Sequence, residues 1–191
     1  RKKYMNKIKI VMYSLIIGFI SGILSVYGLG VFIIYFGGVF FGIGILLCIR
    51  LFFKEKSTTL GHSIGFVIMS TFACFVAIEV YIKLVETSQK SIALLIAGFI
   101  GSLILIFSYN NSFKINLTCM QRFLLIACGS ILSLTAFMGG TKFFKEGLDT
   151  GEITIFFFWQ PIMLAVMMYA TARAEEKNIG SEIKNSPILP K

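Results

Sequence analysis

The chain has 191 residues, of which 57% are hydrophobic and 14% are charged, and it contains 18 glycines. An ordinary soluble domain is about 45–50% apolar even when glycine is counted. This composition therefore excludes a soluble globular enzyme, a disordered chain and a disulfide-rich secreted module, and it predicts a polytopic membrane protein. The formal net charge of +9 fits basic cytoplasmic loops better than nucleic-acid binding.

The apolar runs are continuous, which favours membrane helices over the alternating strands of a β-barrel. The first run is too long for the apolar core of a signal peptide and is interpreted as a retained span. We expect an all-α membrane protein: a six-transmembrane-helix bundle with short loops over residues 1–171, followed by a polar cytoplasmic tail over residues 172–191. The expected spans cover residues 8–27, 33–53, 60–82, 91–108, 121–140 and 153–171.

Basic residues are shared unevenly between the two sides of this predicted bundle. Fourteen of the 18 Lys and Arg residues fall in the amino-terminal segment, the second and fourth connections and the tail, and four fall on the other side. Cytoplasmic loops carry the excess of Lys and Arg, so the bias predicts that both termini are cytoplasmic in a cell (inner) membrane. Termini on one side also require an even number of spans.

Glu79 is an acidic residue inside the third span, about one turn from its outer end. A charge at membrane depth is costly, so it suggests a functional site by default. One interpretation is a polar contact in a cavity open to the outside. The other is an interfacial pair with Lys83, which lies four residues later on the same helix face.

The sequence Trp159-Gln160-Pro161 interrupts the middle of the sixth span. Pro161 removes one helical hydrogen bond and frees the carbonyl of Phe157, so it predicts a kink. An exposed carbonyl, amide and indole would make a ligand surface. The alternative is a structural kink whose polar groups are satisfied by neighbouring helices. The predicted topology places Gln160 and Glu79 in the same outer half of the bundle.

Other candidate chemistry finds little support. The motif G-x-S-x-G at residues 61–65 matches a nucleophile elbow, but no strand precedes it and the one histidine, His62, is the serine's direct neighbour. A single histidine predicts no metal or haem site, and we expect no enzyme and no cofactor. The four cysteines form no C-x-x-C pair and are interpreted as small buried hydrophobes: Cys48, Cys74, Cys119 and Cys128.

Small residues recur four positions apart at Gly18 and Gly22, at Gly38 and Gly42, and at Ala97 and Gly101. This spacing lets helix backbones approach closely. It fits either a dimer face or packing inside one bundle, and the number of helices to be packed favours the second.

In size and number of spans the chain resembles the substrate-binding subunits of energy-coupling-factor vitamin transporters; the resemblance is one of architecture and rests on no motif. Three hypotheses about function stay open. The first is a small-solute binding or transport component with a polar cavity near Glu79, Lys83, Trp159 and Gln160. The second is a non-catalytic scaffold or partner subunit. The third, for which the sequence offers few convergent polar groups, is an intramembrane enzyme. The expected partners are the lipid bilayer, a small solute, and a membrane protein or second copy of the chain, with no nucleic acid.

Overall fold

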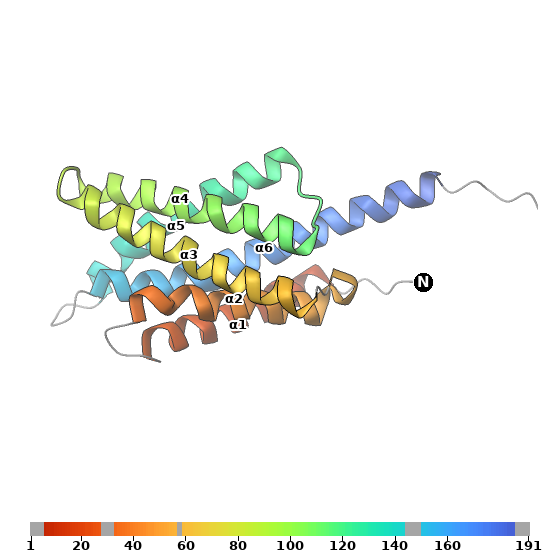
Figure 1. Ribbon diagram of the computed structural model, residues 1–191, viewed down its shortest axis with the longest axis horizontal. Helices are drawn as coiled ribbons and strands as arrows, with labels where there is room; N and C mark the ends of the chain where they lie inside the picture. Colours follow the sequence, from red (N-terminus) through yellow and green to blue (C-terminus); the bar gives the residue numbers. More distant parts are fainter. Residues whose placement is uncertain (1–5, 28–32, 57–58, 144–149, 186–191) are drawn as a thin grey trace, which may run out of the picture.

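The computed structural model describes residues 6–27, 33–56, 59–143 and 150–185, and over these ranges it contains helices and no strand. The predicted basic cluster at residues 1–3, the turn at 28–30, much of the loop 142–152 and the last tail residues lie outside them. The all-helical prediction is confirmed, with an α-helix at each expected span (Figure 1). The elements are α1 (Lys7–Tyr27), α2 (Ile33–Phe52), the 3-10 helix η2 (Lys54–Lys56), α3 (Leu60–Val85), α4 (Lys90–Phe113), α5 (Cys119–Phe143) and α6 (Thr150–Asn185).

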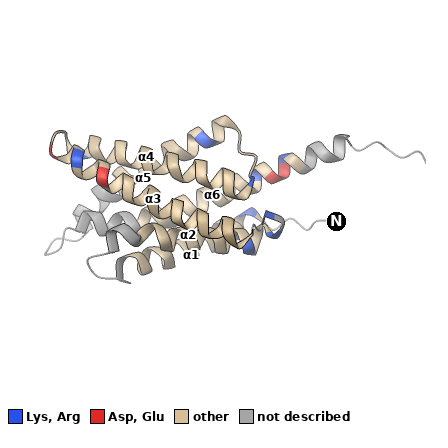
Figure 2. Ribbon diagram, viewed as in Figure 1, with Lys and Arg blue, Asp and Glu red and all other residues tan. Residues whose placement is uncertain are grey.

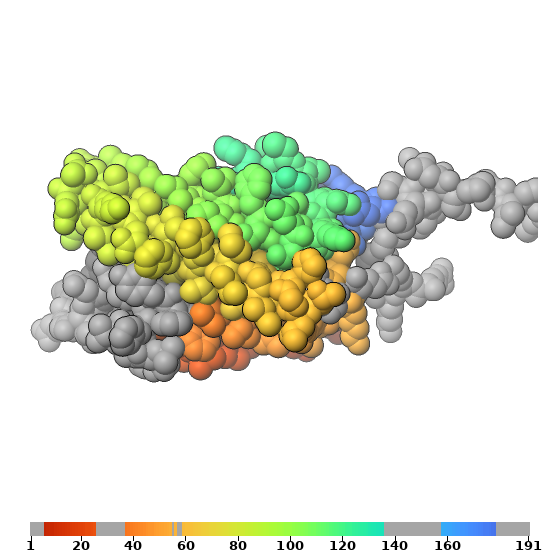
Figure 3. Space-filling model, viewed as in Figure 1, coloured from red at the N-terminus to blue at the C-terminus, as the bar shows by residue number. Residues whose placement is uncertain are grey.

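The six α-helices are arranged as a closed ring. Each helix packs against the next one along the chain, and α6 packs back against α1. Short connections make consecutive helices antiparallel neighbours, as in other helical bundles. Figure 3 shows α3 and α4 side by side along one face of the molecule. The ring brings α6 beside α1, although these two helices lie at opposite ends of the sequence.

Among the residues that the structure describes, three helices are long and apolar enough to cross a membrane, namely Lys7–Ser25, Leu60–Val85 and Lys90–Phe113, and two shorter apolar helices cover Gly37–Phe52 and Cys119–Thr135. Between the ends of the bundle the surface carries exposed large apolar side chains such as Phe72 and Phe107. Figure 2 shows the described charged residues gathered at the two ends of the bundle, with most Lys and Arg at one of them. These features are compatible with a membrane protein.

The helix α4 continues about a turn beyond the end expected at residue 108. The expected loop at Asn110 and Asn111 is helical, and the helix stops at Lys114, whose backbone is left-handed with φ of 49°. The cause is tertiary: Phe113 is buried, with its ring centroid 4.9 Å from that of Phe66. Burial of an aromatic ring outweighs the turn preference of the asparagines.

The helix α6 is also longer than expected and continues to Asn185, through most of the segment interpreted as a tail. Two ion pairs hold its extension against the basic end of the bundle. Lys56 Nζ lies 3.2 Å from a carboxylate oxygen of Glu175, and Lys7 Nζ lies 2.6 Å from one of Glu176. The Ala, Glu and Lys residues of this segment are strong helix formers, which explains why the helix does not stop at residue 171, the expected end of the sixth span.

The small residues mark contacts inside the bundle. A Cβ atom on Gly38 would lie 2.5 Å from the Ser70 carbonyl oxygen of α3, and one on Gly101 would lie 2.9 Å from Ala77 Cβ. Both glycines therefore allow neighbouring helices to approach closely, as the small-xxx-small spacing predicts. These positions support packing within one bundle.

Candidate functional site

Gln160 is buried, with 2% of its surface exposed, and it joins three helices through its amide. Ser21 Oγ of α1 donates to Gln160 Oε1 across 2.8 Å. The Gln160 Nε2 group donates to Ser25 Oγ of α1 at 3.0 Å and to the Gly37 carbonyl of α2 at 3.2 Å. The prediction that Gln160 finds a polar partner on another span is confirmed.

Donors and acceptors in this cluster balance. The Ser25 hydroxyl, which accepts from Gln160, has one proton and donates it to the Ser21 carbonyl at 2.9 Å. The two amide protons and two hydroxyl protons then each have one acceptor. A polar ligand at Gln160 would have to break one of these buried bonds, which is costly in a low-dielectric interior. The cluster therefore acts first as a clasp between α1, α2 and α6.

Trp159, the preceding residue of α6, makes its hydrogen bond to a different helix. Its indole Nε1 donates to the Gly129 carbonyl of α5 at 2.9 Å, and its ring centroid lies 5.1 Å from that of Phe41 in α2. Both polar groups predicted on this segment are thus bound to the protein. Together they tie α6 to the neighbouring helices on both sides.

Pro161 lies inside α6, and the helix is continuous across it. The backbone of α1 comes very close here, because a Cβ on Gly18 would lie 2.5 Å from Pro161 Cα and 3.1 Å from the Gln160 carbonyl oxygen. Gly18 is therefore the residue that lets α1 reach Pro161. The predicted bend of more than about 20° at Pro161 stays a prediction.

Glu79 and Lys83 stand apart from these residues. Glu79 is half-buried and Lys83 is exposed, and over the described residues no ion pair within 4.0 Å joins them. Neither residue lines the cavity described next, although Ile78 and Tyr81 of the same helix do. The structure brings Trp159 and Gln160 together at that cavity and leaves Glu79 and Lys83 outside it.

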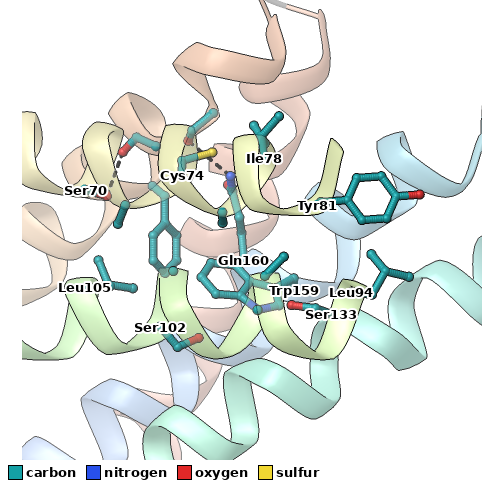
Figure 4. Close-up of a pocket in the computed structure, with 18 of the residues that line it drawn as sticks. Ser70, Cys74, Ile78, Tyr81, Leu94, Ser102, Leu105, Ser133, Trp159 and Gln160 are labelled. Atoms are coloured by element: carbon teal, nitrogen blue, oxygen red, sulfur yellow. Dashed lines mark hydrogen bonds between the residues drawn. The ribbon is translucent and has the colours of Figure 1, made fainter. Parts of the chain in front are cut away.

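A cavity of about 210 Å³ lies between α2, α3, α4, α5 and α6. Figure 4 shows its wall, in which Trp159 and Gln160 of α6 face residues of α3 and α4. Small and aliphatic residues dominate the lining, among them Ala73, Leu94 and Leu105. The cavity follows α3 from Ser70 to Ile82, so it runs along the helices and not across them.

The polar groups in this wall are largely satisfied by the protein. Ser70 Oγ donates to the Gly38 carbonyl at 2.8 Å, and Ser133 Oγ donates to the Gly129 carbonyl at 2.9 Å. Ser102 is the exception, because its hydroxyl is fully buried and has no hydrogen-bond partner among the described residues. The cavity therefore presents a mainly apolar surface, and the Ser102 hydroxyl is enclosed where α4 packs against Gly129 of α5.

The sequence analysis missed Ser21 and Ser25, which complete the Gln160 clasp. Their signal was present: two serines four residues apart on an apolar helix share one face, and a buried polar group needs a partner. The cavity itself leaves no mark in the sequence, because its lining residues are ordinary core residues drawn from five helices.

The remaining candidates stay without a catalytic arrangement in the described part of the chain. His62 Nδ1 lies 2.8 Å from Thr59 Oγ1, and no group of three or more His, Cys, Asp or Glu residues is placed to hold a metal. The four cysteines are free thiols, of which Cys48 is buried and Cys119 is exposed. The exposed thiol of Cys119 differs from the expected small buried hydrophobe, because Cys119 is the first residue of α5 and lies outside the packed core.

Comparison of the chain with known protein families, with curated proteins and with solved structures finds no match.

Proposed function

We propose that the protein is a multi-pass protein of a cell (inner) membrane that binds a small, mainly apolar molecule in the cavity beside Trp159. The observation that carries this proposal is a cavity of about 210 Å³ whose polar neighbours, Gln160 and Trp159 among them, are bound to other helices. Apolar space that the protein's own side chains leave unfilled forfeits packing contacts, and a bound apolar molecule would supply them.

The size of the cavity supports this class of ligand. An engineered cavity of about 150 Å³ lined by Leu, Ile and Phe stays dry and binds benzene or xenon. A ring or short alkyl chain suits the present cavity, because the polar groups around it are either bound to the protein or buried beneath its surface. This proposal replaces the polar solute expected from Glu79 and Gln160 by an apolar one, because Gln160 is fully engaged and Glu79 lies elsewhere.

We further propose six spans with both termini cytoplasmic. The closed ring of six helices and the concentration of Lys and Arg at one end support this topology. The end that carries Lys54, Lys56 and Lys114 would then face the cytoplasm, and the end with Glu79, Lys83 and Glu86 would face outward. A six-helix ring crosses the bilayer as one unit more readily than three of its helices alone, because polar helix ends cannot stay in hydrocarbon.

Binding is tested by fluorescence, because Trp159 is the one tryptophan of the chain and it lines the cavity. Bromobenzene, a small apolar quencher, is titrated into the protein in lipid nanodiscs. We expect a saturable quenching component, since a binding site fills whereas partition into lipid continues to rise. Ala97→Leu, which places a larger side chain in the cavity wall, should remove that component.

The matched control is Ala127→Leu, at a half-buried position of α5 that does not line the cavity. It should keep the saturable component. Quenching that rises linearly in the wild type as well as in both variants would contradict ligand binding in the cavity.

A second candidate function is a non-catalytic partner subunit or scaffold. One observation favours it: α6 continues past the rest of the bundle to Asn185 on the basic side (Figure 1). A helix that leaves the membrane on the cytoplasmic side can present a surface to another protein. Linear quenching in the experiment above, with the helix intact, would make this candidate the better one.

A further inference from the structure

A shallow groove with polar side chains in part of its lining lies on the outside of the bundle, at its basic end, between the start of α3 and the end of α4. It is lined by Thr59, Gly61, His62, Gly65 and Met69 from the α3 side and by Ser108, Asn111 and Ser112 from α4. It is separate from the cavity beside Trp159, with which it shares no residue.

Two of the residues that line this groove are glycines, Gly61 and Gly65, and they differ from the glycines of the core. A Cβ on Gly61 or Gly65 would meet no other atom within 4 Å, whereas one on Gly18 or Gly38 would collide with a neighbouring backbone. A glycine inside a helix costs about 1 kcal/mol relative to alanine. Helix packing within the bundle explains Gly18 and Gly38 and leaves Gly61 and Gly65 unexplained.

The walls of the groove offer hydrogen-bonding groups that the protein does not use. Over the described residues, the side chains of Ser108, Asn111 and Ser112 make no hydrogen bond. Most other described serines within the helices do: Ser70, Ser130 and Ser133, for example, each donate to a backbone carbonyl. When the Thr59 hydroxyl donates to His62 Nδ1, the imidazole carries its proton on Nε2 as one more donor.

Charge and depth decide which ligand fits. No carboxylate lines the groove, Lys114 follows Ser112 by two residues, and Lys54 is exposed on the preceding turn. Exposed Leu60, Ile64 and Ile68 continue from the groove along α3 toward the middle of the bundle. Donors and positive charge at the helix end, followed by an apolar track, match a phosphate headgroup followed by acyl chains.

We propose that this groove binds the phosphodiester headgroup of an anionic membrane phospholipid. The hydroxyls of Ser108 and Ser112, the Asn111 amide and the His62 imidazole donate to the phosphate oxygens. Gly61 and Gly65 leave the space in which the headgroup lies, and the acyl chains follow Ile64 and Ile68. The proposal is independent of the ligand proposed for the inner cavity.

Gly61 and Gly65 also have the spacing of a helix-dimer contact, so a second copy of the chain is the competing occupant. The position of the pair argues against it. Gly61 is the second residue of α3, so a helix touching there would meet α3 only at its end, next to unpaired polar side chains. A lipid headgroup would lie at that depth in a membrane, whereas two crossing helices would meet in the apolar core.

The experiment measures lipid retained by the full chain. Protein purified in detergent and stripped of lipid is mixed with phosphatidylglycerol, with phosphatidylcholine or with inorganic phosphate, and bound molecules are counted by native mass spectrometry. We expect phosphatidylglycerol to be retained over phosphatidylcholine, and inorganic phosphate not to compete, because it lacks the chains. Gly65→Leu, which fills the groove, should weaken retention at least about tenfold, the loss expected for one or more hydrogen bonds to a charged group.

Asn111→Leu should also weaken retention, and Asn116→Leu is its matched control, since Asn116 is exposed at the same end but outside the groove. Gly65 has open space around it, so its replacement should leave folding intact, and the thermal midpoint checks this. Equal retention in Gly65→Leu and wild type, equal retention of the two lipids, or a wild-type dimer that Gly65→Leu converts to a monomer would each overturn the proposal.

Discussion

Gly18 of α1 lies directly against Pro161 of α6, so that a Cβ on Gly18 would fall 2.5 Å from Pro161 Cα. This contact closes the ring of helices at the two elements most distant in sequence. It also places α1 where Ser21 and Ser25 reach the Gln160 amide, one turn and two turns further along the same helix face. The glycine and the amide therefore belong to one interface.

Gly18→Ala should destabilise the bundle. The added methyl group meets backbone atoms on a rigid proline, which cannot move aside as a flexible side chain would, and overpacking of this kind costs about 1–3 kcal/mol. The change is measured as a lower midpoint of thermal unfolding in detergent.

Gly65→Ala is the matched control for that experiment, because the methyl group enters open space. Its midpoint should equal or exceed that of the wild type, since alanine is the better helix former by about 1 kcal/mol. Equal effects of the two substitutions would show that the α1–α6 contact is looser than described.

Gln160→Leu tests the clasp. The substitution places an apolar side chain of similar size there, leaves Ser21 Oγ without its acceptor and removes the amide bond to the Gly37 carbonyl. A buried group left unpaired costs about 1–3 kcal/mol in soluble proteins, and hydrogen bonds between membrane helices average about 0.6 kcal/mol. We expect a lower unfolding midpoint for Gln160→Leu, with a smaller decrease than the one that Gly18→Ala causes.

A double-mutant cycle assigns the effect to the pair. If Ser21 and Gln160 act together, Ser21→Ala should cost little in a Gln160→Leu background, because its partner is already absent. Additive effects of the two substitutions would contradict a clasp between these residues.

Ser102→Ala is expected to leave stability unchanged or to raise it. The hydroxyl is fully buried without a partner, so its removal loses no hydrogen bond and relieves a desolvated polar group. A clear fall in the unfolding midpoint would show that the hydroxyl is paired in the membrane.

Several features of the fold could be predicted from local sequence, and the features that were missed depend on contacts between distant residues. Continuous apolar runs identified all six helices, because the bilayer sets their length. The ends of α4 and α6 were missed: Phe113 is held by contacts with Phe66, and α6 is held by Lys7 and Lys56, and such contacts between distant residues carry no local signal.

The candidate site shows the same division. Gln160 and Trp159 were found because a polar group in an apolar span stands out, and the partner of Gln160 was predicted in kind but not in identity. Glu79 stood out for the same reason, yet it lies outside the cavity. Hydropathy gives a residue's depth in the membrane, whereas the direction it faces depends on how the helices are rotated in the ring.

Glu79→Gln tests whether Glu79, which lies at the depth of the cavity, also faces it. Glu79 does not line the cavity and has no ion pair with Lys83 over the described residues, so the substitution should leave the saturable quenching of Trp159 by bromobenzene unchanged. The control is Ala97→Leu in the cavity wall, which should remove it. A loss of quenching in Glu79→Gln at an unchanged unfolding midpoint would return Glu79 to the ligand site.

The topology is tested by single cysteines at the two ends of the bundle. Asn116 follows α4 at the basic end and Thr87 follows α3 at the opposite end, and both are exposed. In a background without the four native cysteines, a membrane-impermeant maleimide added to intact cells should label Thr87→Cys and spare Asn116→Cys. After lysis both should react.

The physical reason for this expectation is the concentration of Lys and Arg at the Asn116 end, which holds that end in the cytoplasm. Labelling of Asn116→Cys but not Thr87→Cys in intact cells would invert the proposed orientation, and labelling of both would contradict a span between them.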